Sequence, residues 1–183
     1  DRYGYGGAVW NNEAKTITII NCTFTGNNAS YGGAISNCKP INCTFINNTA
    51  IWGGAIYIDN SGVSGNLDGG IFINNKAIQG GAIYIKDGGV IYDCIFINNA
   101  HTFGTESGSI KAINCWFGND ATNYNTKPNM DLDKAIIDNW LFLNATANTT
   151  KLNEGETSTI TFKLELYNDI SKIISPNKLN LLK

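Results

Sequence analysis

Carboxylate side chains are the first candidates for chemistry, because carbohydrate-cleaving enzymes depend on them. Polysaccharide lyases need clustered carboxylates that bind Ca²⁺ and a Lys or Arg base, whereas glycoside hydrolases need two carboxylates at a fixed separation. The acidic residues of the first two thirds of the chain are scattered, at Glu13, Asp59, Asp68, Asp87, Asp93, Glu106 and Asp120. Only Asp59 and Asp87 fall at comparable places, six and seven residues after a Gly-Gly pair, so an active pair is one interpretation. Solvated turn residues are the simpler interpretation, and we predict no catalytic residue and no enzyme.

Histidine and cysteine give no sign of a metal site. The single His, His101, has no Ser or Cys at a motif spacing that would make it a base, and we expect an exposed turn residue. The five Cys contain no Cys-x-x-Cys pair, which argues against zinc. We therefore expect no metal and no cofactor. Buried free thiols are favoured over disulfides because stacked Cys side chains run side by side; a Cys38 to Cys43 link stays open.

Aromatic residues recur at two positions and are candidates for stacking on a ligand. Tyr5, Tyr31 and Trp52 each precede a Gly-Gly pair, and Gln79 and Glu106 follow in the same row. A second row contains Trp10, Ser36, Tyr57, Tyr84 and Lys111, whose variety predicts an outward position. Exposed aromatic rows can bind sugar rings or a protein. Stacking that serves only the stability of the fold is the alternative.

Six Asn residues stand in the acceptor pattern Asn-x-Ser/Thr, namely Asn21, Asn28, Asn42, Asn47, Asn144 and Asn148. Several such patterns arise by chance in a chain this rich in Asn and Thr. Asn21 and Asn42 are expected to point outward, where a glycan would not disturb the core. Glycosylation is therefore a hypothesis that applies if the protein is exported.

Five Phe-centred segments must position all of these residues. They end on Phe24, Phe45, Phe72, Phe96 and Phe117. Successive Phe are 21, 27, 24 and 21 positions apart, a spacing typical of solenoids. Asn follows the first four Phe after three positions. A Gly-Gly-Ala-Val/Ile motif alternates with them, opening at Gly6, Gly32, Gly53 and Gly80, with Ser107-Gly108-Ser109-Ile110 as a degenerate fifth copy.

Alternation within the segments predicts half-buried strands. The position two before each Phe holds Cys22, Cys43, Gly70, Cys94 and Cys115, and the position four before holds Ile20, Ile41, Tyr92 and Ile113 in the copies that have Cys. We expect all of these to face inward, with the five Phe and four Cys as the structural core. Stacked copies bury such faces in a parallel β-helix. Asn pairs fall at the bends, where Asn tolerates a left-handed backbone and its amides can bond between coils.

The chain divides into three predicted regions: repeats over 1–120, a cap or linker over 121–137, and a β module over 138–183. Two alternating strands, 140–147 and 158–166, surround a turn at 153–156, a pattern typical of the start of an immunoglobulin-like sandwich. The module is too short to complete one, so it is either truncated or packed on the solenoid. The chain begins inside a repeat, and we interpret it as a segment of a longer protein.

Composition excludes several function classes. Net charge is −2 and the isoelectric point is near 5.3, without a Lys/Arg cluster, which argues against nucleic acid as a partner. Hydrophobic residues make up 43%, enough for a core, and no apolar run is long enough to span a membrane. Any membrane attachment would come from parts of the parent chain that lie outside this sequence.

The paired motifs, for example Gly53-Gly54-Ala55-Ile56 with Phe72-Ile73-Asn74-Asn75, resemble the repeat of chlamydial-type polymorphic outer-membrane proteins. The same repeat occurs in adhesin-like surface proteins of bacteria and methanogenic archaea. A solenoid followed by Asn-Trp-Leu and a strand pair around Asn-Glu-Gly-Glu is most similar to the archaeal group. The resemblance implies a right-handed, single-stranded parallel β-helix of the pectin lyase-like kind, with about five coils, on a cell surface.

These observations together predict a non-enzymatic, secreted or cell-surface adhesin-like segment. Its β-helix would be a stalk and recognition surface for a glycan or protein of another cell. Self-association into fibres is also open. The alternatives are a carbohydrate-active, pectate-lyase-like β-helix enzyme and a structural subunit of a surface fibre or layer.

Overall fold

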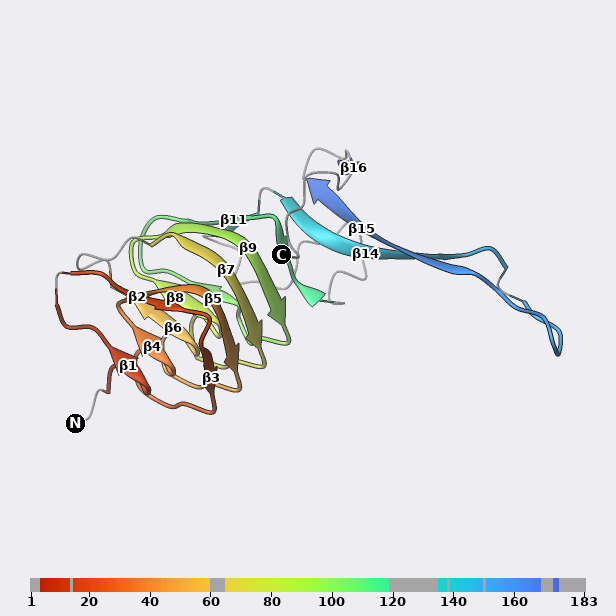
Figure 1. Ribbon diagram of the computed structural model, residues 1–183. Helices are drawn as coiled ribbons and strands as arrows, with labels where there is room; N and C mark the ends of the chain where they lie inside the picture. The colour runs from red at the N-terminus through yellow and green to blue at the C-terminus, as the bar shows by residue number, and fades with distance from the viewer. Residues whose placement is uncertain are drawn as a thin grey trace.

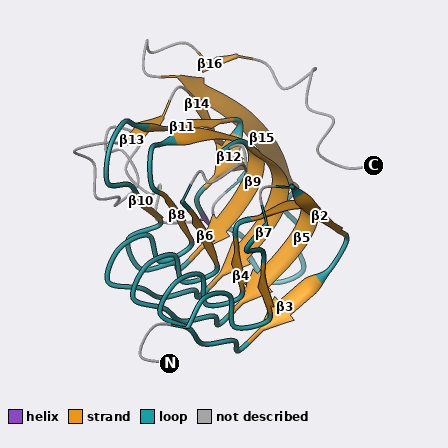
Figure 2. Ribbon diagram, turned by 90° about the vertical axis from the view of Figure 1, so that its left-hand side faces the viewer, coloured by secondary structure: helices purple, strands orange, loops and turns teal. Residues whose placement is uncertain are grey.

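The computed structural model describes residues 4–13, 15–59, 65–118, 135–137, 139–149, 151–168 and 173–174, which form β-strands and turns without an α-helix. The strands make two sheets (Figures 1 and 2). The short sheet contains β1 (Val9–Trp10), β4 (Ile35–Ser36), β6 (Ile56–Ile58), β8 (Ile83–Ile85) and β10 (Phe103–Gly104). The long sheet contains β2 (Ile17–Ile20), β3 (Thr23–Thr25), β5 (Cys38–Ile46), β7 (Leu67–Ile73), β9 (Gly89–Ile97), β11 (Ile110–Ile113) and β12 (Cys115–Trp116), and continues into four later strands.

Strands β1 to β12 pair only in parallel, each with the strand one coil away. The chain passes once through each sheet per coil. Coil 1 contains β1 to β3, coil 2 contains β4 and β5, coil 3 contains β6 and β7, coil 4 contains β8 and β9, and coil 5 contains β10 to β12. The predicted all-β solenoid of about five stacked coils is confirmed, while its right-handed sense stays a prediction.

The five repeated Phe form one continuous stack through the core. Phe45, Phe72 and Phe96 are at most 2% exposed, and the two end members, Phe24 and Phe117, are also buried. Neighbouring ring centroids are 4.9 to 5.4 Å apart and the rings are within 16° of parallel. Each buried ring contributes about 1.5–3 kcal/mol through the removal of apolar surface from water. The stack predicted from the repeat is therefore confirmed.

The Cys column lies beside the Phe stack, and all five Cys are free thiols. Cys38, Cys43, Cys94 and Cys115 are buried, as expected for small apolar side chains. The prediction that Cys22 is part of the core is wrong, because this residue is exposed. It lies in coil 1, and no described coil packs on the far side of coil 1.

A left-handed residue interrupts each coil of the long sheet immediately before the Cys position. These residues are Asn21, Asn42, Gly69, Asp93 and Asn114, with φ between 51° and 65°. A left-handed residue breaks the alternation of side chains along an extended strand. The prediction that Ile20, Ile41, Tyr92 and Ile113 face inward is consequently wrong: Ile20 is 56% and Tyr92 37% exposed. The residue one position earlier enters the core instead, as Ile91 and Ala112 do, both 0% exposed.

A ladder of Asn side chains joins the coils at the bend after the Phe stack. Nδ2 of Asn48 donates to Oδ1 of Asn75, and Nδ2 of Asn75 donates to Oδ1 of Asn99, both at 3.0 Å. Asn27 continues the ladder at the other end with a 2.9 Å bond to Asn48. Asn48 and Asn75 are completely buried. The predicted role of this column, stabilising the turn through bonds between coils, is confirmed.

The Gly-Gly pairs meet two different requirements. Gly53 has a φ of 66°, a backbone conformation that favours glycine. A side chain at Gly54 would overlap with the carbonyl oxygen of Gly81 in the next coil. The first Gly therefore allows the turn, and the second allows neighbouring coils to approach closely.

Coil 5 departs from this motif earlier than the sequence indicates. The N–H of Ala82 donates to the carbonyl of Thr102 (3.1 Å), and Ile83 pairs with Phe103. The segment from His101 to Phe103 thus lies where the other coils have Gly-Gly-Ala-Ile. His101, which is exposed as predicted, has a φ of 50°, close to that of the first Gly in other coils.

The prediction that Ser107–Ile110 is the fifth Gly-Gly-Ala-Ile copy is therefore wrong. Ile110 begins β11 and pairs with Gly89 in the long sheet. Glu106 and Lys111 lie outside the two aromatic rows for the same reason: Glu106 forms an ion pair with Lys86 at 3.7 Å, and Lys111 lies within β11. The motif match was misleading because the turn before β10 is shorter than the same turn in the other coils. The distance in sequence from the preceding Phe therefore no longer identifies the equivalent position in coil 5.

The long sheet continues beyond coil 5. Strand β13 (Ala135–Ile137) pairs in parallel with β11, and β14 (Asn139–Ala147) pairs in parallel with β12. β14 then forms an antiparallel hairpin with β15 (Ile160–Asn168), and β16 (Ile173–Ile174) adds to β15. Figure 1 shows the hairpin projecting from the end of the solenoid.

The predicted strand pair of the C-terminal module is present as β14 and β15. An immunoglobulin-like sandwich requires a second sheet, and the described strands of this region belong to one sheet that begins in the solenoid. The immunoglobulin-like module therefore stays a prediction. Residues 121–134 of the expected cap lie outside the described residues.

Candidate ligand-binding site

Unequal turns between the short and long sheets create a notch in the side of the solenoid. In coil 2 the single residue Asn37 connects β4 to β5, whereas residues 11–16 make this connection in coil 1 and residues 59–66 in coil 3. Among the described residues of the longer connections, Asn11 of coil 1 and Asp59 of coil 3 are both hydrogen-bonded to Asn37. A depression lies at this place, with Asn37 among its lining residues.

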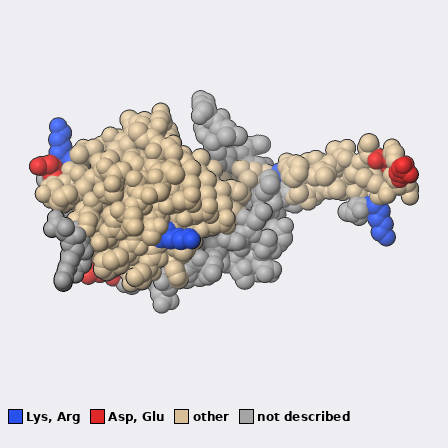
Figure 3. Space-filling model, turned by 90° about the horizontal axis from the view of Figure 1, so that it is seen from below, with Lys and Arg blue, Asp and Glu red and all other residues tan. Residues whose placement is uncertain are grey.

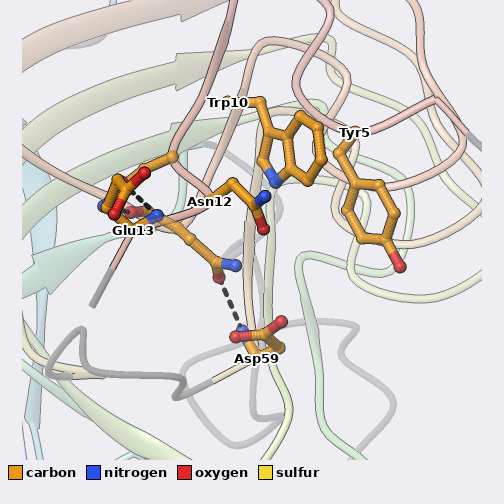
Figure 4. A pocket seen from close by; sticks show the side chains of 7 residues that line it. Tyr5, Trp10, Asn12, Glu13 and Asp59 are labelled. Atoms are coloured by element: carbon orange, nitrogen blue, oxygen red, sulfur yellow. Dashed lines mark hydrogen bonds between the residues drawn. The ribbon is translucent and has the colours of Figure 1, made fainter.

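This notch contains a pocket of about 460 Å³ (Figure 4). Coil 1 contributes Tyr5, Trp10 and the turn residues Asn11, Asn12 and Glu13. Coils 2 and 3 contribute Asn37 and Asp59. Two aromatic rings, two carboxylates and three amides therefore surround one space.

Hydrogen bonds from two buried Asn hold the base of the pocket. Nδ2 of Asn11 donates to the carbonyls of Asn37 (2.9 Å) and Lys15 (3.0 Å), and its Oδ1 accepts from the N–H of Glu13 (3.0 Å). Oδ1 of Asn37 accepts from the N–H of Asp59 (3.0 Å). These bonds connect the three turns, so the backbones that carry the two carboxylates are fixed relative to each other.

The six candidate aromatic residues form one cluster next to the pocket. Tyr5 stacks on Tyr31 (4.6 Å between centroids), which stacks on Trp52 (4.7 Å). Tyr5 also stacks on Trp10 at 5.3 Å. Trp10 is 49% exposed and is the one exposed member of the cluster. The faces of Tyr31 are covered by its neighbours in the stack, which leaves Trp10 as the ring best placed to meet a ligand.

Tyr57 and Tyr84 stack on each other at 5.5 Å and are only 8% and 5% exposed. They alternate with core Ile residues and so point away from the core, as predicted, but the expected exposure is wrong. The ring of Tyr31 meets Tyr57 edge to face at 5.0 Å, so the turn aromatics cover the outside of the short sheet. Burial, and then the negative charge of Asp59, raise the pKa of the Tyr57 phenol.

The interpretation of Asp59 and Asp87 as an active pair is not supported by the strand register, which does not align them. Ile58 pairs with Ile85, so that Asp59 is level with Lys86. The Asp87 carboxylate instead accepts a hydrogen bond from the Ser107 hydroxyl at 2.9 Å. Within the described part of the chain, no group of three or more His, Cys, Asp or Glu side chains is placed to hold a metal ion.

Sequence reasoning missed the placement of Glu13 and Asp59 at one pocket. They are 46 positions apart in the sequence, almost two coils, and no motif contains both. The signal that points to the notch is the Phe spacing, which rises from 21 to 27 positions between Phe45 and Phe72. The extra residues lengthen the turn of coil 3, next to the one-residue turn of coil 2.

Three segments, residues 21–38, 42–59 and 69–86, match the Chlamydia polymorphic membrane protein repeat. Each begins at a left-handed residue of the long sheet, passes the Phe stack and the Asn ladder, and runs through the next strand of the short sheet. These three segments are therefore similar to the polymorphic membrane protein repeat. Searches of curated proteins and of solved structures gave no match. The affinity to archaeal proteins stays a prediction.

The segments that match this repeat carry most of the candidate glycosylation sites, on the outside of the coils. Asn21, Asn28, Asn42 and Asn47 are all exposed. In the hairpin, Asn148 is exposed but its Oδ1 accepts bonds from Ser158 and Thr159, and the Asn144 side chain lies outside the described part of the structure. Glycan attachment stays a hypothesis. In the described ranges, no helix has the length and apolar character needed to cross a membrane.

Proposed function

We propose that this chain is a non-enzymatic, adhesin-like part of a cell-surface protein. The stacked coils act as a stalk, and the side chains on their outside form a recognition surface for other cells or glycans. The observation that carries this proposal is the match of three coils to the polymorphic membrane protein repeat. That repeat is named for membrane proteins, which is consistent with a surface location.

The construction of the coils supports a stalk. Parallel strand pairing, the Phe stack and the Asn ladder all connect one coil to the next. Stability in such a solenoid is the sum of contributions from neighbouring coils, so its length can vary without loss of the core. Outward positions that stay exposed, such as Trp10, are not needed for packing of the core and are available for recognition.

The surface supports recognition of weakly charged ligands. The face in Figure 3 shows few charged side chains over the solenoid, and the formal net charge of the chain is −2. A surface of this kind gives little long-range attraction for polyanions. Neutral glycans and uncharged protein surfaces are the ligand classes that fit it.

Attachment and cleavage can be measured on one purified sample of the 183-residue chain. We expect saturable binding to cells or to glycans on an array, without degradation of the bound polysaccharides. Protease treatment of intact cells that make the protein should also remove it, as expected for surface exposure. Degradation of a polysaccharide without binding to any array glycan or cell would contradict the proposal.

A carbohydrate-active enzyme is the second candidate, and one observation favours it: Glu13 and Asp59 line the same pocket. Glycoside hydrolysis needs two carboxylates on opposite sides of a glycosidic bond. A Glu13→Gln variant that loses cleavage while it keeps binding would establish this alternative.

A fibre subunit is the third candidate, and the hairpin favours it. Ile160 and Phe162 are 57% and 64% exposed on β15, and between residues 142 and 147 β14 has no described partner other than β15. Unpaired strand edges with apolar side chains promote pairing with other chains. Filaments seen by electron microscopy at micromolar concentration would support this candidate over a monomeric stalk.

A further inference from the structure

We propose that the notch between coils 1 and 3 binds one neutral pyranose unit of a glycan, with Trp10 as the stacking platform. This inference rests on the proposed recognition function and specifies its ligand. Three features carry it: a half-exposed indole, two carboxylates from different coils that line one pocket, and hydrogen bonds from two buried Asn that connect these coils.

Trp10 offers an apolar face for the C–H side of a sugar ring. It is 49% exposed, and the neighbouring ring of Tyr5 supports it at 5.3 Å and an interplanar angle of 17°. The Tyr5 ring is in turn stacked on Tyr31. A rigid, supported aromatic ring loses little conformational entropy when a ligand packs on it.

The carboxylates of Glu13 and Asp59 complement hydroxyl groups. An ionised carboxylate only accepts hydrogen bonds, whereas a sugar hydroxyl can donate one. Bonds that involve a charged acceptor are also stronger than neutral ones. Asn12, which is exposed on the same turn as Glu13, adds an amide that can both donate and accept.

The charge of the pocket selects against acidic sugars. Of the described residues that line it, two are acidic and none is basic. A uronate or sialate placed there would face like charges without a compensating cation, which is unfavourable. Neutral hexoses are therefore the sugar class that fits.

A cationic side chain from a protein partner is the competing ligand, because an ammonium group also suits carboxylates and an indole face. The pocket volume of about 460 Å³ and the exposed amide of Asn12 favour the larger, hydroxyl-rich ligand. Salt separates the two: binding of a cation weakens as ionic strength rises, whereas binding of a neutral sugar changes little.

The test uses the full 183-residue chain on an array that carries neutral hexose glycans, uronate glycans and sialylated glycans, followed by titration of the best neutral glycan at 0.05 and 0.5 M NaCl. Trp10→Ala should weaken binding about tenfold or more. Glu13→Gln should weaken it about three- to tenfold.

The matched controls are Trp52→Ala, a Trp of the same cluster outside the pocket, and Glu106→Gln, an exposed acid on another turn. Both variants should keep the affinity for the glycan within about twofold of the parent chain. Circular dichroism of each variant establishes that it is folded.

Several results would overturn the inference. Binding of neutral glycans that Trp10→Ala and Glu13→Gln leave unchanged would refute the site but not the adhesin function. The same holds if the chain attaches to cells yet binds only polylysine, in a salt-sensitive manner, or binds acidic glycans better than neutral ones. Failure to bind any glycan, peptide or cell would reject the proposed function together with the site.

Discussion

Asn48 and Asn75 lie one above the other in neighbouring coils, completely buried, with Oδ1 of Asn75 accepting bonds from both the backbone N–H and the side-chain Nδ2 of Asn48 at 3.0 Å. One amide oxygen thus satisfies two buried donors. Because buried donors without a partner are costly, this pair identifies the Asn ladder as a structural element that connects the coils.

Loss of one ladder amide should destabilise the protein strongly. In Asn75→Ala, the buried donors of Asn48 lose their acceptor, and we expect the free energy of unfolding to fall by about 2–4 kcal/mol. Urea unfolding followed by circular dichroism measures this. Asn28→Ala, at an exposed Asn next to the ladder, should change it by less than about 0.5 kcal/mol. Equal effects at the two positions would contradict the ladder.

The Phe stack predicts a contrast between two Phe residues. Phe72→Ala removes a ring that is 1% exposed and stacked on both sides, and should cost about 3–5 kcal/mol of unfolding free energy. Phe162→Ala removes a ring that is 64% exposed on the hairpin, and should cost less than about 0.5 kcal/mol. Phe72→Leu keeps most of the volume and should fall between them. A reversed order in denaturant midpoints would refute the core.

Close approach of the coils predicts that Gly54 cannot carry a side chain. A methyl group there would overlap with backbone atoms of Gly81 and Lys76, so the coils must separate locally. We expect Gly54→Ala to lower the free energy of unfolding by about 2–3 kcal/mol. Gly4→Ala has open space around it and serves as the control. Thermal melting of the two variants provides the comparison, and a neutral Gly54→Ala would show that the coils are farther apart than described.

Buried thiols predict a loss of stability in alkaline solution. Burial raises the pKa of Cys38 and Cys43 above the ordinary value of 9.0, and a hydrogen bond with Cys115, together with burial, raises the pKa of Cys94. The folded state therefore holds these protons more tightly than the unfolded state does. The stabilisation is complete below pH 9 and declines as the pH rises from 9 toward the raised pKa values.

Urea midpoints measured from pH 7 to pH 11 test this dependence. A Cys43→Ala/Cys94→Ala variant should lose less stability over this range than the parent chain. Cys22→Ala, at an exposed thiol, should follow the parent. Parallel curves for all three proteins would mean that buried thiols do not cause the alkaline loss.

The repeat columns could be predicted from the sequence because one residue type recurs at a fixed distance from another. Phe45 and Phe72, and Asn48 and Asn75, are aligned in space because the distance between the two motif positions is constant within each coil. The outward position of Tyr92 could not be predicted by counting in twos, since the left-handed Asp93 breaks the alternation. The sequence does contain a sign of the left-handed residue, because Asn, Gly or Asp precedes each Cys position.

The pocket could not be predicted because it depends on differences between coils. Glu13 and Asp59 come together only where a one-residue turn at Asn37 lies between two longer turns. The length of a turn can be counted only when the ends of its two strands are known, and this requires the register of every coil. Coil 5 is an example of a register that the sequence predicts wrongly. Ser107–Ile110 resembles the Gly-Gly-Ala-Ile motif, but it leads into the long sheet and not into the short one.

A crystal structure of the chain with a bound neutral hexoside is the most direct test of the claim that the coils form a recognition surface. We predict a sugar ring packed on Trp10, with hydroxyl groups within hydrogen-bond distance of Glu13 and Asp59. A glycan that binds in solution but occupies another surface in the crystal, with the notch left to solvent, would contradict it.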